Sequence, residues 1–330
     1  MDAFIYNSPM PDSVAIVGAG VSGLTCAVVL AERGYQTAIF AEETGRRTTS
    51  AVAAAIWYPY DAEPIDKVIA WALETYHVLV DLSRKPSTGV SMIELRTFSR
   101  SGEIQIPEWA SPLGASVIPT EVEESLTVLP AAFKSGFSMN VPLTDTTIYL
   151  DYLTNRFLDA GGGINPNVRF ETLEEVSREF DLIINCSGIG AKLLVPDAEL
   201  EPHRGQVAIV SKIDLPCAVV CDDLPLMYAI PRASDCVFGG TNELSDNYEP
   251  DPAATSRIVT ECSRVLDVPA PKILAQRVGL RPFRKSGVCL RADRLRDRRA
   301  VIHNYGHGGS GFTLSWGCAE ELFRIADLSG

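Results

Sequence analysis

Three glycines near the start of the chain have the spacing of a loop that binds the phosphates of a dinucleotide. Gly18, Gly20 and Gly23 follow directly after the apolar run 13–17. In such a loop the first glycine permits a tight turn, the second lets backbone N–H groups approach a pyrophosphate, and the third lets helix and strand pack closely. The positive end of the following helix would face the phosphates. We therefore predict dinucleotide contacts from Gly18, Ala19, Gly20, Val21, Ser22 and Gly23.

An acidic residue at the end of the next apolar run supports this interpretation. Glu42, with Glu43 beside it, follows the run 36–41. A carboxylate at this spacing accepts hydrogen bonds from ribose hydroxyls. It also repels the 2′-phosphate of NADP, so the residues themselves leave NAD or FAD as the dinucleotide.

The predicted elements that position these residues fall into α/β segments, with strands and helices in alternation, and β-rich segments between them. The segment 13–41 predicts strand, glycine turn, helix and strand, and a similar alternation returns around 150–185 and 300–326. An amphipathic helix is predicted over 61–82, capped by Asp61, and a hairpin is predicted to pair 92–98 with 103–106. Further strands are predicted at 207–211, 218–221, 236–239 and 288–290. We expect an α/β fold in which a Rossmann-like dinucleotide-binding domain is interleaved with an α+β domain built on a largely antiparallel sheet.

Composition excludes several classes of protein. The 330 residues are 46% hydrophobic and carry a net charge of −13, so the chain can bury a core and lacks the basic surface of a nucleic-acid-binding protein. No apolar run is long enough to span a membrane, and residues 1–13 lack the features of a signal peptide, so we expect a cytoplasmic protein. The eight cysteines show neither CxxC nor zinc spacing, so we expect buried thiols and no metal site. A bridge between Cys236 and Cys289 remains open if two strands bring them together.

Five segments resemble, in chain order, the D-amino-acid oxidase family of flavoproteins, which includes the D-aspartate oxidases. The most specific is 302–317 (IHNYGHGGSGFTLSWG), which is close to the C-terminal signature of that family. The other four segments are 52–60 (VAAAIWYPY), 204–206 (RGQ), 228–231 (YAIP) and 279–284 (GLRPFR).

The resemblance implies FAD as cofactor and adds residues to its site. It places Thr48, Thr49 and Ser50 beside the phosphates, Phe170 at the adenine edge and Ser187 at the flavin. The second flavin-contacting segment contributes Ala54, Ala55 and Ile56. The glycine loop before the last predicted helix would direct its N–H groups at the pyrimidine edge of the flavin, through Gly308, Gly309, Ser310, Gly311, Phe312 and Thr313. We expect His303 and His307 to be structural and to orient this loop.

The resemblance also implies a substrate site. Arg281 can bind a carboxylate bidentately, Tyr228 can add a phenol hydrogen bond, and the Gly309 carbonyl would accept from the α-amine. These contacts would fix Cα beneath flavin N5, so that the α-hydrogen leaves as hydride and no general base is needed. The implied reaction converts a D-amino acid, O2 and water to a 2-oxo acid, ammonia and hydrogen peroxide.

The residues expected around the substrate side chain are mainly apolar. They are Ile56, Tyr58, Ile230 and Ser310, and no second cation is evident for an acidic side chain. We therefore expect a preference for neutral, apolar D-amino acids and a short, open entrance at 222–227. Alternatives are a glycine or sarcosine oxidase, a D-aspartate oxidase, a dehydrogenase that passes electrons to a quinone or protein, and a flavin-binding protein without catalysis.

The predicted domains are discontinuous. The FAD-binding domain is expected to comprise 1–60, 146–200 and 294–330, and the substrate-binding domain 61–145 and 201–293. Partners are expected to be a small D-amino acid and O2, without nucleic acid or membrane, and the sequence is compatible with a homodimer.

Overall fold

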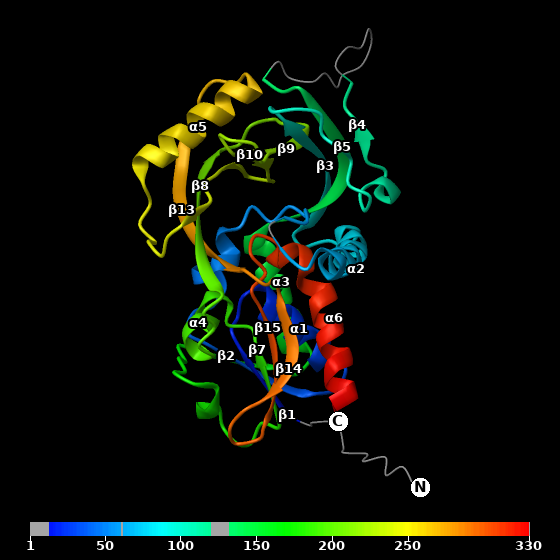
Figure 1. The fold of residues 1–330 in the computed structure, drawn as a ribbon, viewed down its shortest axis with the longest axis vertical. Coiled ribbons are helices and arrows are strands. Elements are labelled where there is room, and N and C mark those ends of the chain that lie inside the picture. Colours follow the sequence, from blue (N-terminus) through cyan, green and yellow to red (C-terminus); the bar gives the residue numbers. More distant parts are fainter. Residues whose placement is uncertain (1–12, 61, 120–131, 330) are drawn as a thin grey trace.

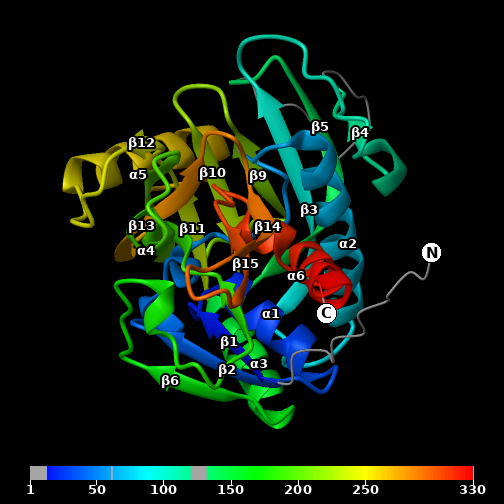
Figure 2. The ribbon, with the colours of Figure 1, turned by 60° about the horizontal axis from the view of Figure 1, so that its bottom comes forward.

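A computed structural model describes residues 13–60, 62–119 and 132–329, and its first layer is a six-stranded sheet (Figures 1 and 2). The five strands from β15 to β6 are parallel, and β14 joins the edge antiparallel to β15. In spatial order the strands are β14 (Cys289–Arg294), β15 (Ala300–Tyr305), β7 (Leu182–Asn185), β1 (Ser13–Val17), β2 (Gln36–Ala41) and β6 (Gly163–Pro166). Mostly parallel sheets of this kind bind ligands beyond the carboxyl ends of their strands.

Local sequence explains the β1–α1–β2 unit well. Helix α1 (Val21–Ala31) begins directly after Gly20, and β1 pairs in register with β2 from Ser13↔Gln36 to Val17↔Phe40. Gly18 has a φ of +112°, which favours glycine, and a Cβ at Gly23 would lie 2.0 Å from the Gly18 carbonyl oxygen. The predicted turn and the predicted close packing of helix on strand are both confirmed.

The remaining helices pack on the two sheets, with α5 against β8, β10 and β11 of the second sheet and α2 between α6 and the second-sheet strands β3 and β5. Helix α6 lies against both α1 and α2, and α1 also packs on α3. The helices are α2 (Ile65–Ser83), α3 (Thr146–Asp159), α4 (Ala191–Leu194), α5 (Pro252–Leu266) and α6 (Gly311–Ser329). Single 3-10 turns are η1 (Gly45–Arg47), η2 (Thr49–Val52), η3 (Ser111–Leu113), η4 (Leu173–Glu175) and η5 (Gly188–Gly190). None of these described helices is long and apolar enough to span a membrane.

The second layer is a nine-stranded sheet that is largely antiparallel, as expected. Among the described strand pairs of this sheet, only β3 with β9 is parallel. The long strands β8 and β13 run side by side from this sheet toward the first one (Figure 1). The strands are β3 (Val90–Ser99), β4 (Ser116–Val117), β5 (Ser135–Thr144), β8 (Leu200–Ser211), β9 (Cys217–Cys221), β10 (Met227–Pro231), β11 (Asp235–Gly239), β12 (Glu243–Leu244) and β13 (Ile273–Arg284).

Two local predictions are wrong. The segment 103–106 is not a strand, because β3 pairs instead with β5 and β9, and the backbone N–H of Ile104 donates to Ser135 Oγ at 2.7 Å. Helix α2 begins at Ile65 rather than near 61, with Pro64 preceding its first turn. Ile65 is 58% exposed, because the buried face of α2 starts at Val68. The proposed cap, Asp61, lies outside the described residues.

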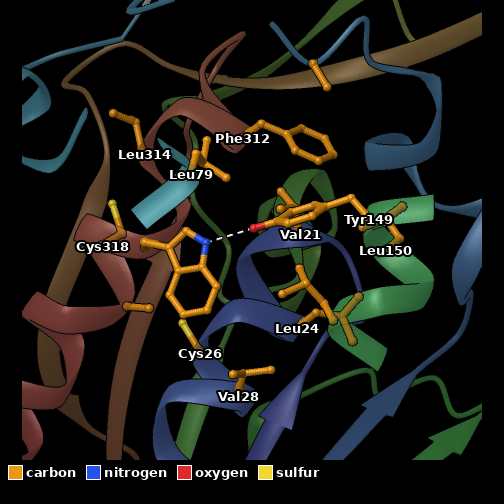
Figure 3. Packing of buried hydrophobic residues seen from close by; sticks show 14 of the residues in the cluster. Val21, Leu24, Cys26, Val28, Leu79, Tyr149, Leu150, Phe312, Leu314 and Cys318 are labelled. Carbon is orange, nitrogen blue, oxygen red and sulfur yellow. Dashed lines mark hydrogen bonds between the residues drawn. The ribbon is translucent and has the colours of Figure 1, made fainter. Parts of the chain in front are cut away.

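A buried hydrogen bond ties α6 to α3 inside the main core. The indole N–H of Trp316 donates to the Tyr149 hydroxyl at 2.8 Å, and Figure 3 shows this bond among packed apolar side chains from α1, α3 and α6. All eight cysteines are buried free thiols. Cys236 lies in β11 and Cys289 in β14, which belong to different sheets, so a bridge between them is excluded.

Candidate active site

One large cavity lies where the carboxyl ends of the first sheet meet the second sheet. Its volume is about 1160 Å³, and residues from Val17 to Thr313 line it. The volume exceeds the usual range for a small-molecule site, about 300–1,000 Å³, which suits a dinucleotide together with a substrate. Of the predicted site residues, only Gly23 and Ser310 are absent from the cavity wall.

The glycine turn and the start of α1 form one end of this cavity. The N-cap residue Gly20 offers no side-chain cap to α1, and a Cβ there would lie 3.0 Å from Ser50 Oγ. Ser50 Oγ accepts a hydrogen bond from the Val21 N–H at 2.9 Å, which holds the 48–50 segment against the helix start. The helix terminus, the bare glycine backbone and the nearby hydroxyls of Thr48 and Thr49 form a cradle that fits the pyrophosphate of FAD.

Charged residues surround the end of the cavity beyond β2. Glu42 is 3.3 Å from Arg169 Nη1, and both side chains are more than half exposed. Phe170 lies on this wall with its ring centroid 5.8 Å from that of Phe40. Arg47, which was not predicted, also lines this end. These groups can contact a ribose and an adenine.

The glycine loop before α6 is held largely by its own hydrogen bonds. The Gly308 N–H donates to the Pro282 carbonyl at 2.9 Å, and the Ser310 N–H donates to the His307 carbonyl at 2.9 Å. These two N–H groups therefore do not point at a ligand, contrary to the expectation for the whole run. Gly309 and Gly311 remain on the cavity wall with Phe312 and Thr313.

Two hydroxyls clasp this loop to the segment that follows η2. Thr313 Oγ1 accepts from the Tyr58 N–H at 3.2 Å and donates to the Tyr58 carbonyl at 3.1 Å. Ser310 Oγ accepts from the Tyr60 N–H at 2.8 Å and donates to the Tyr60 carbonyl. Ser310 is fully buried by this role, so it does not contact a substrate side chain as predicted. Instead, it fixes two segments of the cavity wall together.

The two histidines of the last signature are buried and neutral at physiological pH. Burial lowers the pKa of His307 and that of His303 to about 4. His307 Nε2 lies 2.9 Å from Asn304 Oδ1, while the Asn304 amide donates to Cys26 Sγ at 3.2 Å. Because the Asn304 oxygen can only accept, His307 Nε2 carries the proton. These contacts fit the predicted structural role.

The predicted carboxylate-binding pair sits at the opposite end of the cavity, against bare backbone. Arg281 Nη1 donates to the Thr241 carbonyl at 3.0 Å. A Cβ at Gly205 would lie 2.4 Å from Arg281 Nη1, and one at Gly239 would lie 1.9 Å from Tyr228 Cζ. Both side chains therefore depend on a glycine beneath them. Burial raises the pKa of Tyr228, although the nearby guanidinium opposes this shift, so the phenol keeps its proton as a donor.

An apolar wall continues from this pair. Ile56, Tyr58 and Ile230 line the cavity as predicted, and the Tyr58 ring packs edge-on against Trp109 with centroids 6.3 Å apart. Burial raises the pKa of Tyr58, and the carboxylate of Asp222 raises it further. Asp222 also lines the cavity and was not predicted as a site residue.

Other wall residues were not predicted individually, although one of them, Tyr60, ends the 52–60 segment. Tyr60 covers Gly309, where a Cβ would lie 2.7 Å from the Tyr60 ring. Leu226 and Asp222 come from the short turn between β9 and β10. Only 218–221 of this stretch was predicted as a strand, and the alternation of Val220 with Asp222 just beyond its end was the available signal.

Comparison with known proteins agrees with this arrangement. The family described as FAD dependent oxidoreductase matches residues 13–325. The chain is 39% identical over 318 residues to a D-amino-acid oxidase of Rubrobacter xylanophilus, covering 94% of each protein, and 37% identical over 321 residues to one of Streptomyces coelicolor, covering 95% and 96%. It is 31% identical over 331 residues to human D-aspartate oxidase, covering 94% of each. The fold is also that of glycine oxidase from Geobacillus kaustophilus, with a TM-score of 0.78 at 16% identity, covering 96% of this chain and 95% of the other.

Proposed function

The chain belongs to the family of FAD-dependent oxidoreductases, and we propose that it oxidises D-amino acids with O2 to 2-oxo acids, ammonia and hydrogen peroxide. The observation that carries this proposal is the pairing of Arg281 with Tyr228 at the end of the cavity away from the glycine cradle. A fixed cation and a protonated phenol together suit a carboxylate, which every amino acid has.

FAD, when bound, supplies the acceptor for a hydride and returns the electrons to O2. The protein's part is to orient the substrate. Arg281 binds the carboxylate as a fork, Tyr228 donates a second hydrogen bond to it, and the Gly309 carbonyl accepts from the α-amine. His307 is not assigned as a base, because its Nε2 proton is engaged by Asn304.

The proposed substrates are D-amino acids whose side chains are predominantly neutral and apolar. Ile56, Tyr58 and Ile230 form the wall beside the carboxylate-binding pair. Among the described residues at this end of the cavity, Arg281 is the one cation, and it is committed to the α-carboxylate. A substrate with an acidic side chain would therefore bury a second carboxylate without a partner.

We also propose that the chain folds into two interleaved units. We propose further that the protein is cytoplasmic and forms a homodimer. The unit that binds FAD is proposed to comprise 1–60, 146–200 and 294–330, and the unit that binds substrate 61–145 and 201–293. The order of strands in the two sheets supports two interleaved units, but β14 joins the first sheet from Cys289, which favours a last boundary near 289 over one at 294.

The anaerobic visible spectrum of the FAD-loaded protein tests the proposed activity. We expect D-alanine to bleach the flavin, L-alanine to leave it unchanged, and air to restore the colour. Equal or faster bleaching by glycine or sarcosine would favour an amine oxidase of the same fold, and bleaching without recovery in air would indicate a dehydrogenase.

A matched pair of variants tests the assigned residue. Arg281→Lys keeps the charge but loses the fork, so KM for D-alanine should rise roughly tenfold to a hundredfold. Arg257→Lys, on the exposed face of α5, should change nothing. An unchanged KM in a folded Arg281→Lys protein would refute the assignment.

A further inference from the structure

An exposed tyrosine on the cavity wall has no part in the contacts described above. Tyr248 lies in the loop between β12 and α5 and is 57% exposed, yet it lines the cavity. Of the large apolar side chains that are exposed in the described part of the chain, only Tyr248 and Leu193 of α4 belong to this wall. Apolar surface left open on the wall of a cavity is typical of a ligand contact.

Tyr248 lies at the end of the cavity beyond β2. Partial burial raises the pKa of Tyr248, and the carboxylate of Glu43 raises it further, so the phenol is a neighbour of Glu43. Glu42 and Glu43 follow β2, where the wall can contact a ribose and an adenine. The second-sheet part of the chain thus brings an aromatic ring to the adenosine end of the cofactor site.

A buried arginine holds the loop on both sides of Tyr248. Arg204 is 4% exposed and begins the 204–206 segment, which the proposed reaction does not explain. Its Nε donates to the carbonyl of Asn247 at 2.9 Å, and its Nη2 donates to the carbonyl of Glu249 at 2.7 Å. Because these carbonyls belong to the residues directly before and after Tyr248, the guanidinium fixes the backbone that carries the ring.

A buried amide extends this anchor to the start of α5. Gln206 Oε1 accepts from Arg204 Nη2 at 2.7 Å and from the Asp251 N–H at 2.9 Å. Gln206 Nε2 donates to the Asp251 carbonyl and to Thr255 Oγ1, both at 2.7 Å. The amide has two acceptor and two donor positions, and all four are used, so its orientation is fixed. The loop of Tyr248 is therefore held in place before any ligand binds.

We propose that Tyr248 is a cofactor-binding residue whose ring packs against the adenosine half of FAD, and that Arg204 and Gln206 are positioning residues that hold it there. A base has an apolar face on which an aromatic side chain can stack. Because the loop is already ordered, binding does not have to fix its backbone. The proposal concerns FAD alone and does not depend on which substrate Arg281 binds.

The first test measures binding of FAD to the apoprotein by flavin fluorescence, with no amino acid present. We expect Tyr248→Ala to raise the Kd about tenfold and Tyr248→Phe, which keeps the ring, to change it less than twofold. Leu244→Ala is the matched control, because Leu244 is 67% exposed in the neighbouring β12 but lies outside the cavity wall. An unchanged Kd in a folded Tyr248→Ala protein would overturn the proposal.

Two halves of the cofactor locate the contact. ADP carries the adenosine end of FAD, and FMN carries the flavin end. We expect Tyr248→Ala to weaken the binding of ADP, measured by competition with FAD, by the same factor as that of FAD, and to leave the Kd for FMN unchanged. A loss confined to FMN, or an equal loss for both halves, would refute the contact with adenosine. None of these outcomes depends on oxidation of a D-amino acid, so failure of the proposed function leaves the test intact.

A double variant tests the positioning role. Gln206→Ala should raise the Kd for FAD severalfold in the unmodified protein but less than twofold in the Tyr248→Ala background, because it acts through the ring. If Gln206→Ala does not fold, Gln206→Glu takes its place, since it keeps the shape and loses the two donors. Factors that multiply in the double variant would refute the positioning role of Gln206.

Discussion

The Tyr228 ring packs directly against Gly239, and this contact gives a specific prediction for the variant Gly239→Ala. A Cβ at this position would lie 1.9 Å from Tyr228 Cζ and 2.1 Å from Cε2, whereas ordinary contacts begin near 3.4 Å. The Gly239 backbone has no positive φ, so the new methyl group acts on the ring and does not strain its own residue. The ring must move by about 1.5 Å, which takes its hydroxyl away from the carboxylate-binding position.

The expected loss follows from the hydrogen bond that the phenol would give up. A hydrogen bond to a charged group contributes about 1.5–3 kcal/mol, so KM for D-alanine should rise roughly tenfold to a hundredfold. Tyr228→Phe removes the same hydroxyl but leaves the ring in place, so its defect should be equal or smaller. Initial rates of O2 consumption across D-alanine concentrations measure both.

Controls separate this effect from misfolding. Gly163→Ala adds a methyl group in β6, where nothing lies within 4 Å of the new Cβ, and should behave as the unmodified protein. The visible spectrum and the melting temperature report whether Gly239→Ala still binds FAD and folds. A folded, FAD-loaded Gly239→Ala protein with an unchanged KM would refute the assignment of Tyr228 to the substrate carboxylate.

Three further predictions concern the core, the glycine loop and the cofactor end. Tyr149→Phe leaves the buried Trp316 N–H without its acceptor, so urea titration should show about 1–3 kcal/mol less stability; no loss would mean that the bond contributes nothing. The folded-state pKa of His307, about 4, lies below its unfolded value of about 6.5, so stability present above pH 6.5 is lost as the pH falls toward 4. Between pH 7.5 and 5 this amounts to about 2 kcal/mol, and His307→Gln should lose that much less over the same range, whereas an equal loss in both proteins would contradict a neutral buried His307. Glu42→Ala should raise the Kd of the apoprotein for FAD about tenfold, measured by flavin fluorescence, with Glu179→Ala, an exposed carboxylate outside the cavity wall, as its matched control; equal effects would show that Glu42 has no specific contact.

The parts of the fold that sequence predicted well are those whose signals are local. The turn at Gly18, the start of α1 and the bounds of β2 all follow from apolar runs and glycines within a few residues of each other. The segment 103–106 has the apolar alternation of a strand, yet its hairpin pairing loses to the long-range pairing of β3 with β5 and β9. No local pattern encodes that competition.

The candidate site shows the same division. Gly18, Gly20 and Arg281 could be named because a motif carries them, and they line the cavity. Asp222 and Tyr60 could not, since their place depends on which face of a strand or loop turns inward. Ser310 was assigned to the substrate pocket on position alone, but its hydroxyl is consumed by the backbone of Tyr60.

The hydrogen bonds between the 58–60 segment and the loop before α6 have a consequence for folding during synthesis. Ser310 and Thr313 reach back over some 250 residues to bind backbone that is synthesised early. The first sheet is likewise incomplete until β15 has been synthesised and pairs with β7. A nascent chain on the ribosome therefore exposes an unfinished cavity until its last strand and helix emerge. FAD can therefore bind only after translation is complete. A chain whose translation stops before β15 has no finished cavity, and its exposed apolar residues make it prone to aggregation and proteolysis.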